Sequence, residues 1–185
     1  AKERASERLE ERKVEIKEKL DERLQERMEK LADMLNEKND HLTDVYLKHL
    51  ERIEEVLDKV LTRVDKLAEQ YDLDLSNFIV SAEVVRVEID VVMDLVLVQK
   101  EKVYTINAET KEEFGEAFRA TMSEFKDDHQ IVRTSLRGIR DELHDFFSEV
   151  KETLKAATPA DKNEQKFSIF NKRDHRIHNF SKFFK

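Results

Sequence analysis

The sequence predicts an all-α protein, an elongated three-helix hairpin or coiled-coil bundle with a very long N-terminal helix. Two observations predict this fold. Only two glycines and one proline interrupt 185 residues, so residues that break helices are almost absent. Apolar side chains also recur every three or four positions along most of the chain, as on one face of an α-helix. Charged residues make up 41% of the chain and hydrophobic residues 39%, which suits a thin core of two or three helices.

The first expected helix covers about residues 5–71. Its apolar spacing continues on both sides of the polar stretch 36–41, so we interpret the helix as continuous or merely kinked there. The first thirty residues carry ten basic and ten acidic side chains beside a narrow apolar stripe. Such a stripe is typical of a two-stranded helical seam and would be marginally stable alone in water.

The second expected helix covers about residues 76–105, and either Asp74 or Ser76 can cap its start. One apolar stripe contains Phe78, Ala82, Val85, Ile89, Val92, Val96 and Val103. A second stripe contains Val80, Val84, Val87, Val91, Leu95 and Val98. Residues 85–91 also alternate as in a strand, but the charges fall on one helical face, which favours a helix. Two stripes predict burial on two sides.

The third expected helix covers about residues 110–157. Thr110 followed by Glu113 matches a capping box, the clearest helix start in the chain. Apolar residues then repeat from Phe114 to Leu154, and Pro159 ends the pattern. Two glycines, 115 and 138, lie inside this helix, where they indicate a close helix approach, a kink or chance.

We therefore expect a helical bundle over residues 1–157 and a separate tail over residues 158–185. The tail holds seven basic and three acidic residues, whereas the rest of the chain is acidic enough to give a net charge of −8. Its apolar residues have helical spacing, so it is expected to dock on protein, with an anionic membrane and single-stranded nucleic acid as other surfaces. Nucleic acid is disfavoured because the acidic body would repel phosphates. The expected docking residues are Phe167, Phe170, Arg173, Arg176, Ile177, Phe180, Phe183 and Phe184.

The sequence predicts no catalytic, cofactor-binding or metal-binding residues, and hence no enzyme. With no cysteine, the chain has no disulfide, zinc-thiolate site or thiol nucleophile. It also lacks a phosphate-binding glycine loop and a local nucleophile motif. His175 with His178, and Asp141 with His144, have the three-residue offset of some metal-binding helices, but neither pair recurs with a carboxylate motif on another helix.

No apolar run is long enough to span a membrane, since the most apolar stretch, 80–98, contains five charged residues. The N-terminal residue, Ala1, is compatible with removal of a signal peptide, with removal of an initiator methionine, or with a boundary of another origin. We expect an extracellular or cell-surface protein, with the cytoplasm as the alternative.

The unequal helix lengths predict self-association. In an up-down-up hairpin the second helix would leave ~55 Å of the first helix and ~27 Å of the third uncovered, at opposite ends. Uncovered apolar stripes favour contact with another copy, and a head-to-tail contact could propagate as a filament. Two alternatives are a turn at 36–41 that closes a four-helix bundle and an antiparallel dimer. The expected interface comprises Leu9, Ile16, Leu20, Leu24, Met28, Val80, Val84, Val87, Val91, Leu95, Val98, Phe146, Phe147, Val150 and Leu154.

The layout also resembles a known group of proteins. The charged N-terminal helix, the related runs 50–53 and 63–67, the turn 72–76 and the helix 114–154 resemble exported all-helical proteins of ultra-small candidate-phyla bacteria. That resemblance implies an extracytoplasmic helical protein of unassigned role whose mature chain starts near Ala1. The chain departs from the group in its valine-dense second helix and its basic, phenylalanine-rich tail.

These observations together predict a non-enzymatic structural protein that needs no cofactor and forms a homo-oligomer, an extracellular filament or a surface layer. Its tail is expected to dock on a neighbouring subunit. The alternative is a binding module whose tail engages an anionic membrane surface or nucleic acid.

Overall fold

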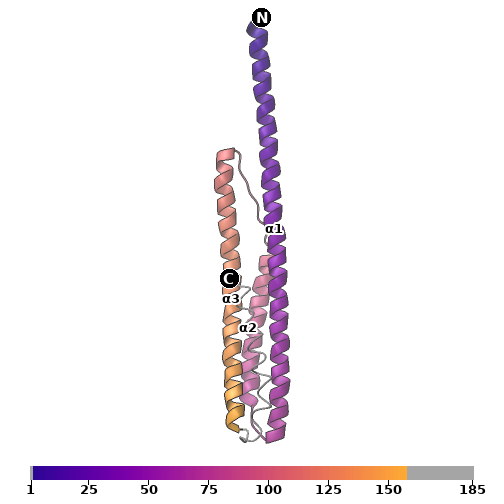
Figure 1. Cartoon of the computed structure of the whole chain (residues 1–185), viewed down its shortest axis with the longest axis vertical. Coiled ribbons are helices and arrows are strands. Elements are labelled where there is room, and N and C mark those ends of the chain that lie inside the picture. The colour runs from indigo at the N-terminus through magenta and orange to yellow at the C-terminus, as the bar shows by residue number, and fades with distance from the viewer. Residues whose placement is uncertain (1, 158–185) are drawn as a thin grey trace. The chain divides into compact units, whose positions relative to one another are not determined.

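A computed structural model describes the backbone of residues 2–157 and the side chains of residues 10–157. Its three helices are α1, Lys2–Tyr71, α2, Ser76–Lys100, and α3, Lys111–Ala157 (Figure 1). The predicted all-α fold is confirmed, since no strand occurs within this range. Because α1 has no break across residues 36–41, the alternative in which the chain turns there is wrong.

The described residues form two compact units. Unit 1 contains residues 2–42 and 99–129, and unit 2 contains residues 43–98 and 130–157. The expected bundle over 1–157 is therefore divided between them, and the tail at 158–185 lies outside the described residues.

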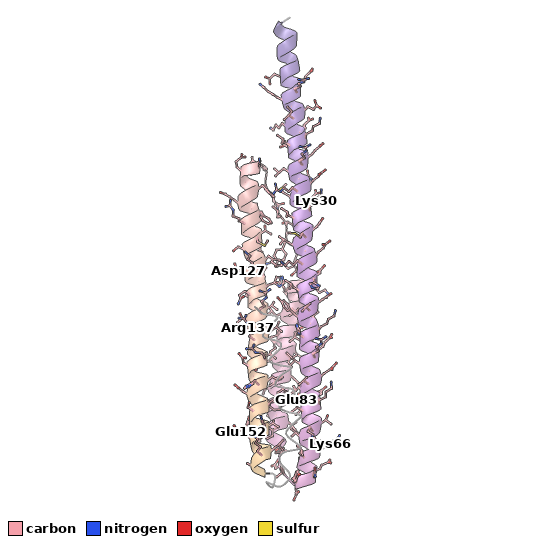
Figure 2. The ribbon with its side chains drawn as sticks, viewed as in Figure 1. Lys30, Lys66, Glu83, Asp127, Arg137 and Glu152 are labelled. Carbon is pink, nitrogen blue, oxygen red and sulfur yellow. The ribbon has the colours of Figure 1, made fainter. Side chains whose placement is uncertain are left out.

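Unit 2 is a three-helix bundle with an apolar core. Phe78 of α2 meets Phe146 of α3 edge-on in this core, with ring centroids 6.3 Å apart. Charged side chains such as Lys66 and Glu152 lie exposed on its outer surface (Figure 2). The core residues are Leu50, Leu57, Val60, Val64, Leu67, Phe78, Ala82, Val85, Ile89, Val92, Val96, Val132, Leu136, Ile139, Leu143, Phe146, Phe147, Val150 and Leu154.

The turn between α1 and α2 follows from local capping. Asp72 adopts a left-handed conformation with φ of 52°, and the Leu73 amide donates to the Ala68 carbonyl at 3.0 Å. This is the pattern of a Schellman cap. Of the two predicted capping residues for α2, Asp74 performs the role, because its carboxylate accepts the Ser76 amide at 3.1 Å. Hydrogen bonds from the Ser76 side chain and from its backbone amide lower the pKa of Asp74.

Unit 1 contains the N-terminal part of α1, the start of α3 and an irregular connector, residues 101–110, that links α2 to α3 along the chain. Leu35, Tyr104 and Phe125 form its buried apolar cluster, flanked by Leu42 and Met122. The Arg27 guanidinium lies 5.2 Å from the centre of the Phe114 ring. The start of α3 therefore packs on α1 within unit 1.

The start of α3 confirms the predicted cap. The Glu113 amide donates to the Thr110 hydroxyl at 3.3 Å, while the Glu113 carboxylate accepts the Glu109 amide at 3.1 Å. Neither glycine of α3 marks a close helix approach. A Cβ at Gly138 would meet nothing within 4 Å, and a Cβ at Gly115 would meet only Arg119 Nη2 at 3.5 Å.

Candidate functional site

The second helix ends at Lys100 rather than near 105, because a group of polar side chains holds the chain in an extended form. We call this group the polar clamp: Asn36, Asn39, Gln99, Lys102, Tyr104 and Asp128. The Asn36 side chain donates to the Tyr104 carbonyl at 3.1 Å and accepts the Tyr104 amide at 2.8 Å. These two bonds replace the backbone bonds that a longer helix would supply.

Asn39 extends the polar clamp to the end of α2. Its amide nitrogen donates to the carbonyls of Gln99 at 2.9 Å and Lys102 at 3.2 Å. Its amide oxygen accepts from Gln99 Nε2 at 2.9 Å, and that same nitrogen lies 2.7 Å from the Tyr104 hydroxyl. Because Asn39 and Gln99 are buried, each of these bonds satisfies a group that has no access to water.

A charged group closes the other side of the polar clamp. Asp128 Oδ2 accepts from the Tyr104 hydroxyl at 2.7 Å and from Lys102 Nζ at 2.6 Å. Lys102 also pairs with Glu124 at 2.8 Å. Thr121 of α3 donates to the Thr105 carbonyl at 3.0 Å, which fixes the next residue of the connector.

The protonation states of these residues suit a fixed clamp rather than proton transfer. The hydrogen bonds to Asp128 and Glu124 raise the pKa of Lys102. Burial, with the hydrogen bond to Asp128, raises the pKa of Tyr104 to about 12. Burial alone would raise the pKa of Asp128, but the bonds from Lys102 and Tyr104 lower it below its usual value. At neutral pH the lysine and tyrosine are thus protonated and the aspartate is ionised, so none of the three is poised as a general acid or base.

The apolar spacing of the sequence does not predict the polar clamp. From that spacing, residues 36–41 are only a polar stretch within a helix, and residues 101–105 are the end of the second helix. One available signal was the presence of Asn36 and Asn39 on the same face of α1 as the apolar stripe, where a polar residue requires a buried partner.

Two apolar surfaces remain uncovered in the described part of the chain. The first is the N-terminal segment, residues 10–26 of α1, in which Ile16 and Leu20 are each 58% exposed. Leu24 and Met28, further along the same stripe, are half-buried, and Leu35 is fully buried. Leu9, also expected in the interface, lies among residues whose side chains the structure does not describe. A single stripe thus passes from covered to uncovered toward the N-terminus.

The second uncovered surface is the valine stripe of α2: Val80, Val84, Val87, Val91, Leu95 and Val98. Its five valines are 56–69% exposed, and Leu95 is half-buried. The other stripe of α2 packs into the unit 2 core, except Val103, which lies exposed in the connector. Within the described residues, burial of α2 on two sides is therefore not observed.

The C-terminal part of the expected interface needs correction. Phe146, Phe147, Val150 and Leu154 are at most 7% exposed, because they face α1 and α2 in the core of unit 2. They are unavailable to a second copy. The expected tail residues Phe167, Phe170, Arg173, Arg176, Ile177, Phe180, Phe183 and Phe184 lie outside the described residues.

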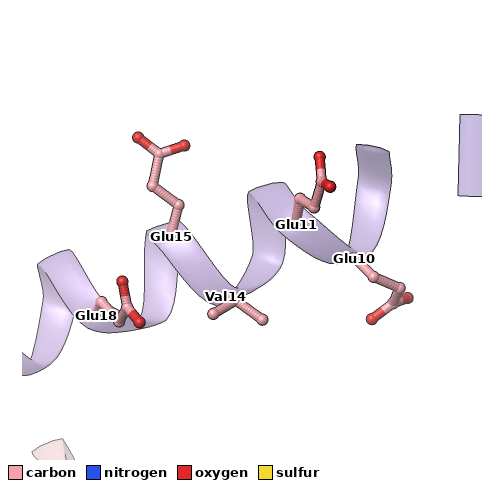
Figure 3. A pocket seen from close by; sticks show the side chains of 5 residues that line it. All are labelled: Glu10, Glu11, Val14, Glu15 and Glu18. Atoms are coloured by element: carbon pink, nitrogen blue, oxygen red, sulfur yellow. The ribbon is translucent and has the colours of Figure 1, made fainter. Parts of the chain in front are cut away.

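The described residues contain an acidic cluster on α1 and a pair of glutamates in unit 2. Glu10, Glu11, Glu15 and Glu18 surround Val14 in a shallow surface depression, and all five side chains project from the same helix (Figure 3). Lys13 pairs with Glu10 at 2.7 Å and Lys19 with Glu15 at 2.6 Å, which stabilises the helix. In unit 2, a hydrogen bond shared with Glu88, together with burial, raises the pKa of Glu142 to about 7.

Among the described side chains, residues 10–157, no group of three or more acidic, histidine or cysteine residues is arranged to hold a metal ion. Asp141 and His144 are exposed, and Asp141 accepts from the neighbouring Arg140 at 2.6 Å. None of the helices described combines the length and apolar character needed to cross a membrane.

Comparison of the chain with protein families, with curated proteins and with solved structures finds no match.

Proposed function

We propose that this chain is a non-enzymatic structural protein that self-assembles through the N-terminal segment of α1. The observation that carries the proposal is the exposure of Ile16 and Leu20 on a stripe whose continuation, at Leu35, is buried. The occupant of the exposed part is the N-terminal segment of a second copy. An apolar stripe of this width is the kind of surface that a two-stranded helical seam buries.

Charge supports a second copy as the occupant. The whole chain carries a net charge of −8, so most surfaces of two copies repel each other. The N-terminal segment is different, because acidic and basic side chains are interspersed along it and almost balance. Two such segments can approach with opposite charges facing across the seam, whereas more acidic surfaces cannot.

Stability of the segment itself supports the same occupant. No other described residue covers Ile16 or Leu20, and the ion pairs of Lys13 and Lys19 are exposed. Exposed pairs of this kind contribute little to stability, because water screens the two charges. A single helix is therefore marginal in this region, and burial against a second helix supplies the missing stabilisation.

The finer form of the proposal is a subunit of an extracellular filament or surface layer. The resemblance of the helical layout to exported proteins supports this location. A filament requires a second contact in addition to the N-terminal seam, which by itself joins two copies.

The test measures molar mass by light scattering of the full chain after size exclusion, over a range of concentrations. We expect association of the unchanged chain and loss of association in the double variant I16K/L20K. Removing two apolar side chains from the seam should raise the dissociation constant by at least about 100-fold. The matched control is E11Q/E18Q, which changes the net charge equally but leaves the stripe intact.

The control should associate as the unchanged chain does. A chain that stays monomeric up to millimolar concentration would contradict the proposal. Association that survives I16K/L20K would show that another surface joins the copies.

A further inference from the structure

We propose that the C-terminal segment of the same chain, residues 160–185, covers the valine stripe of α2 and completes unit 2 as a four-helix bundle. This goes beyond the proposed self-assembly, which uses a different surface. The stripe is a long surface to leave in water: its valines repeat over residues 80–98, and all five are more than half exposed. Continuous exposed apolar surfaces of this kind mark a contact.

The charges around the valine stripe select a basic occupant. Glu83, Asp90 and Asp94 lie exposed on α2, and Glu88 lies half-buried. Arg86 is the one basic residue of α2 between residues 76 and 98, and it is paired with Asp58 at 2.5 Å. The valine stripe of a second copy would bring like charges together, which disfavours contact between two such stripes.

The C-terminal segment has the required complementary chemistry. Residues 160–185 carry seven basic and three acidic residues, together with five phenylalanines. The apolar positions 167, 170, 177, 180 and 184 have helical spacing, so the sequence predicts an amphipathic helix with basic flanks. Docked on α2, this helix would place aromatic rings on the valines and lysines or arginines near the acidic borders.

The length and starting point of the segment also fit. Within unit 2, α3 ends at Ala157 at the same end as the turn between α1 and α2, which is where the valine stripe begins (Figure 1). Pro159 forbids a straight continuation of α3. Residues 162–185 would span ~36 Å as a helix, compared with ~27 Å for residues 80–98.

A covalently linked occupant has a large advantage over a free one. A short connection gives an effective concentration in the millimolar range. The turn needs only residues 158–161, which is a usual length for the connection between antiparallel helices. The chain's own segment therefore outcompetes a second copy for this stripe at ordinary protein concentrations.

Cysteine accessibility tests this contact in the full chain. Because the sequence contains no cysteine, a single V87C substitution provides a unique thiol in the stripe. We expect this thiol to react with a maleimide at least about 10-fold more slowly than the thiol of an I131C variant, since Ile131 is 58% exposed on α3 and does not belong to the valine stripe. V91C serves as a second probe in case V87C disturbs the packing.

Changes in the C-terminal segment then assign the protection. R173E/R176E and F170S/F180S, each combined with V87C, should raise the V87C rate to that of I131C. The control K48E/K66E makes the same charge change at exposed lysines of α1 and should leave V87C protected. Circular dichroism shows whether each variant keeps its helices.

Three results would overturn the proposal. The thiols of V87C and V91C could react as fast as that of I131C in the unchanged background. The segment variants could leave protection intact, which would mean that something else covers the stripe. Protection could also disappear on dilution from micromolar to nanomolar concentration, which would assign the stripe to a second copy. None of these results affects the I16K/L20K test of self-assembly.

Discussion

Units 1 and 2 are both helical, but different interactions determine their folds. Unit 2 buries three repeating apolar stripes against one another, and many side chains share the stabilisation. Unit 1 buries a small apolar cluster and holds an extended connector through hydrogen bonds from Asn36 and Asn39. The difference indicates that periodicity alone determines unit 2, whereas a few individual polar residues determine unit 1.

The largest expected loss of stability comes from a substitution on the buried face of α2 in unit 2. Ile89 is fully buried and Val87 is 61% exposed, although the two residues are two positions apart. We expect I89A to lower the free energy of unfolding by about 3 kcal/mol, because it leaves a cavity in the core. V87A, made in the F170S/F180S background so that the C-terminal segment does not cover the valine stripe, should lower it by less than about 1 kcal/mol. Urea denaturation followed by circular dichroism measures both, and equal losses would mean that the two faces of α2 are equally buried.

The next largest expected effect is a loss of stability in unit 1. N39A removes the amide that contacts Gln99 and the Lys102 carbonyl, so buried polar groups lose their partners. We expect a loss of about 2 kcal/mol, concentrated in unit 1. Hydrogen exchange should show faster opening of residues 99–129 and little change in the core of unit 2.

The control for N39A is N107A, an exposed asparagine of the same connector. It should leave hydrogen exchange of both units unchanged. A uniform loss of protection throughout the chain in N39A would show that the polar clamp does not act locally.

The same difference between the units explains why the fold of unit 2 can be predicted from the sequence and the polar clamp of unit 1 cannot. The apolar spacing correctly predicted α1, the start of α3 and the buried face of α2, because each follows from a repeat or a local cap. The polar clamp depends on which residues meet across sixty or more positions of sequence, as Asn39 and Gln99 do. No local pattern encodes that pairing, so the end of α2 was predicted five residues too late.

The candidate surfaces were predicted in part. The exposed positions Ile16, Leu20 and Val87 belong to the interface expected from the sequence. Phe146 and Val150 do not, because helical spacing shows that a stripe exists but not which neighbour covers it. Burial of a stripe is a property of the tertiary contact and requires the structure.

A smaller effect sharpens the comparison by stabilising unit 2 alone. Gly138 lies in α3 with open space where a Cβ would stand. We expect G138A to raise the free energy of unfolding by about 0.5–1 kcal/mol, since alanine restricts the unfolded chain and favours the helix. Hydrogen exchange should show the gain at residues 130–157, and a loss of stability would indicate a close neighbour at this position.

The smallest effect concerns pH and unit 2. The pKa of Glu142 is raised to about 7, so the folded chain binds this proton more tightly than the unfolded chain, whose glutamate has a pKa near 4.5. The pair with Glu88 therefore lowers stability as pH rises through about 7. Because Glu142 is exposed, the effect should be below about 1 kcal/mol.

E142Q removes the titrating group and should be more stable than the unchanged chain at pH 8 and equal or less stable at pH 5. Thermal unfolding at both pH values measures this difference. An identical pH dependence of the two proteins would contradict the raised pKa of Glu142.

The central claim is that the two uncovered surfaces have different occupants: a second copy for the N-terminal segment and the chain's own C-terminal segment for the valine stripe. Sedimentation velocity on four full-length proteins tests it most directly: the unchanged chain, I16K/L20K, F170S/F180S and the combination of all four substitutions. We predict that I16K/L20K sediments as a monomer at concentrations where the unchanged chain and F170S/F180S associate. Association of I16K/L20K, with monomers in F170S/F180S, would contradict the claim and assign assembly to the C-terminal segment.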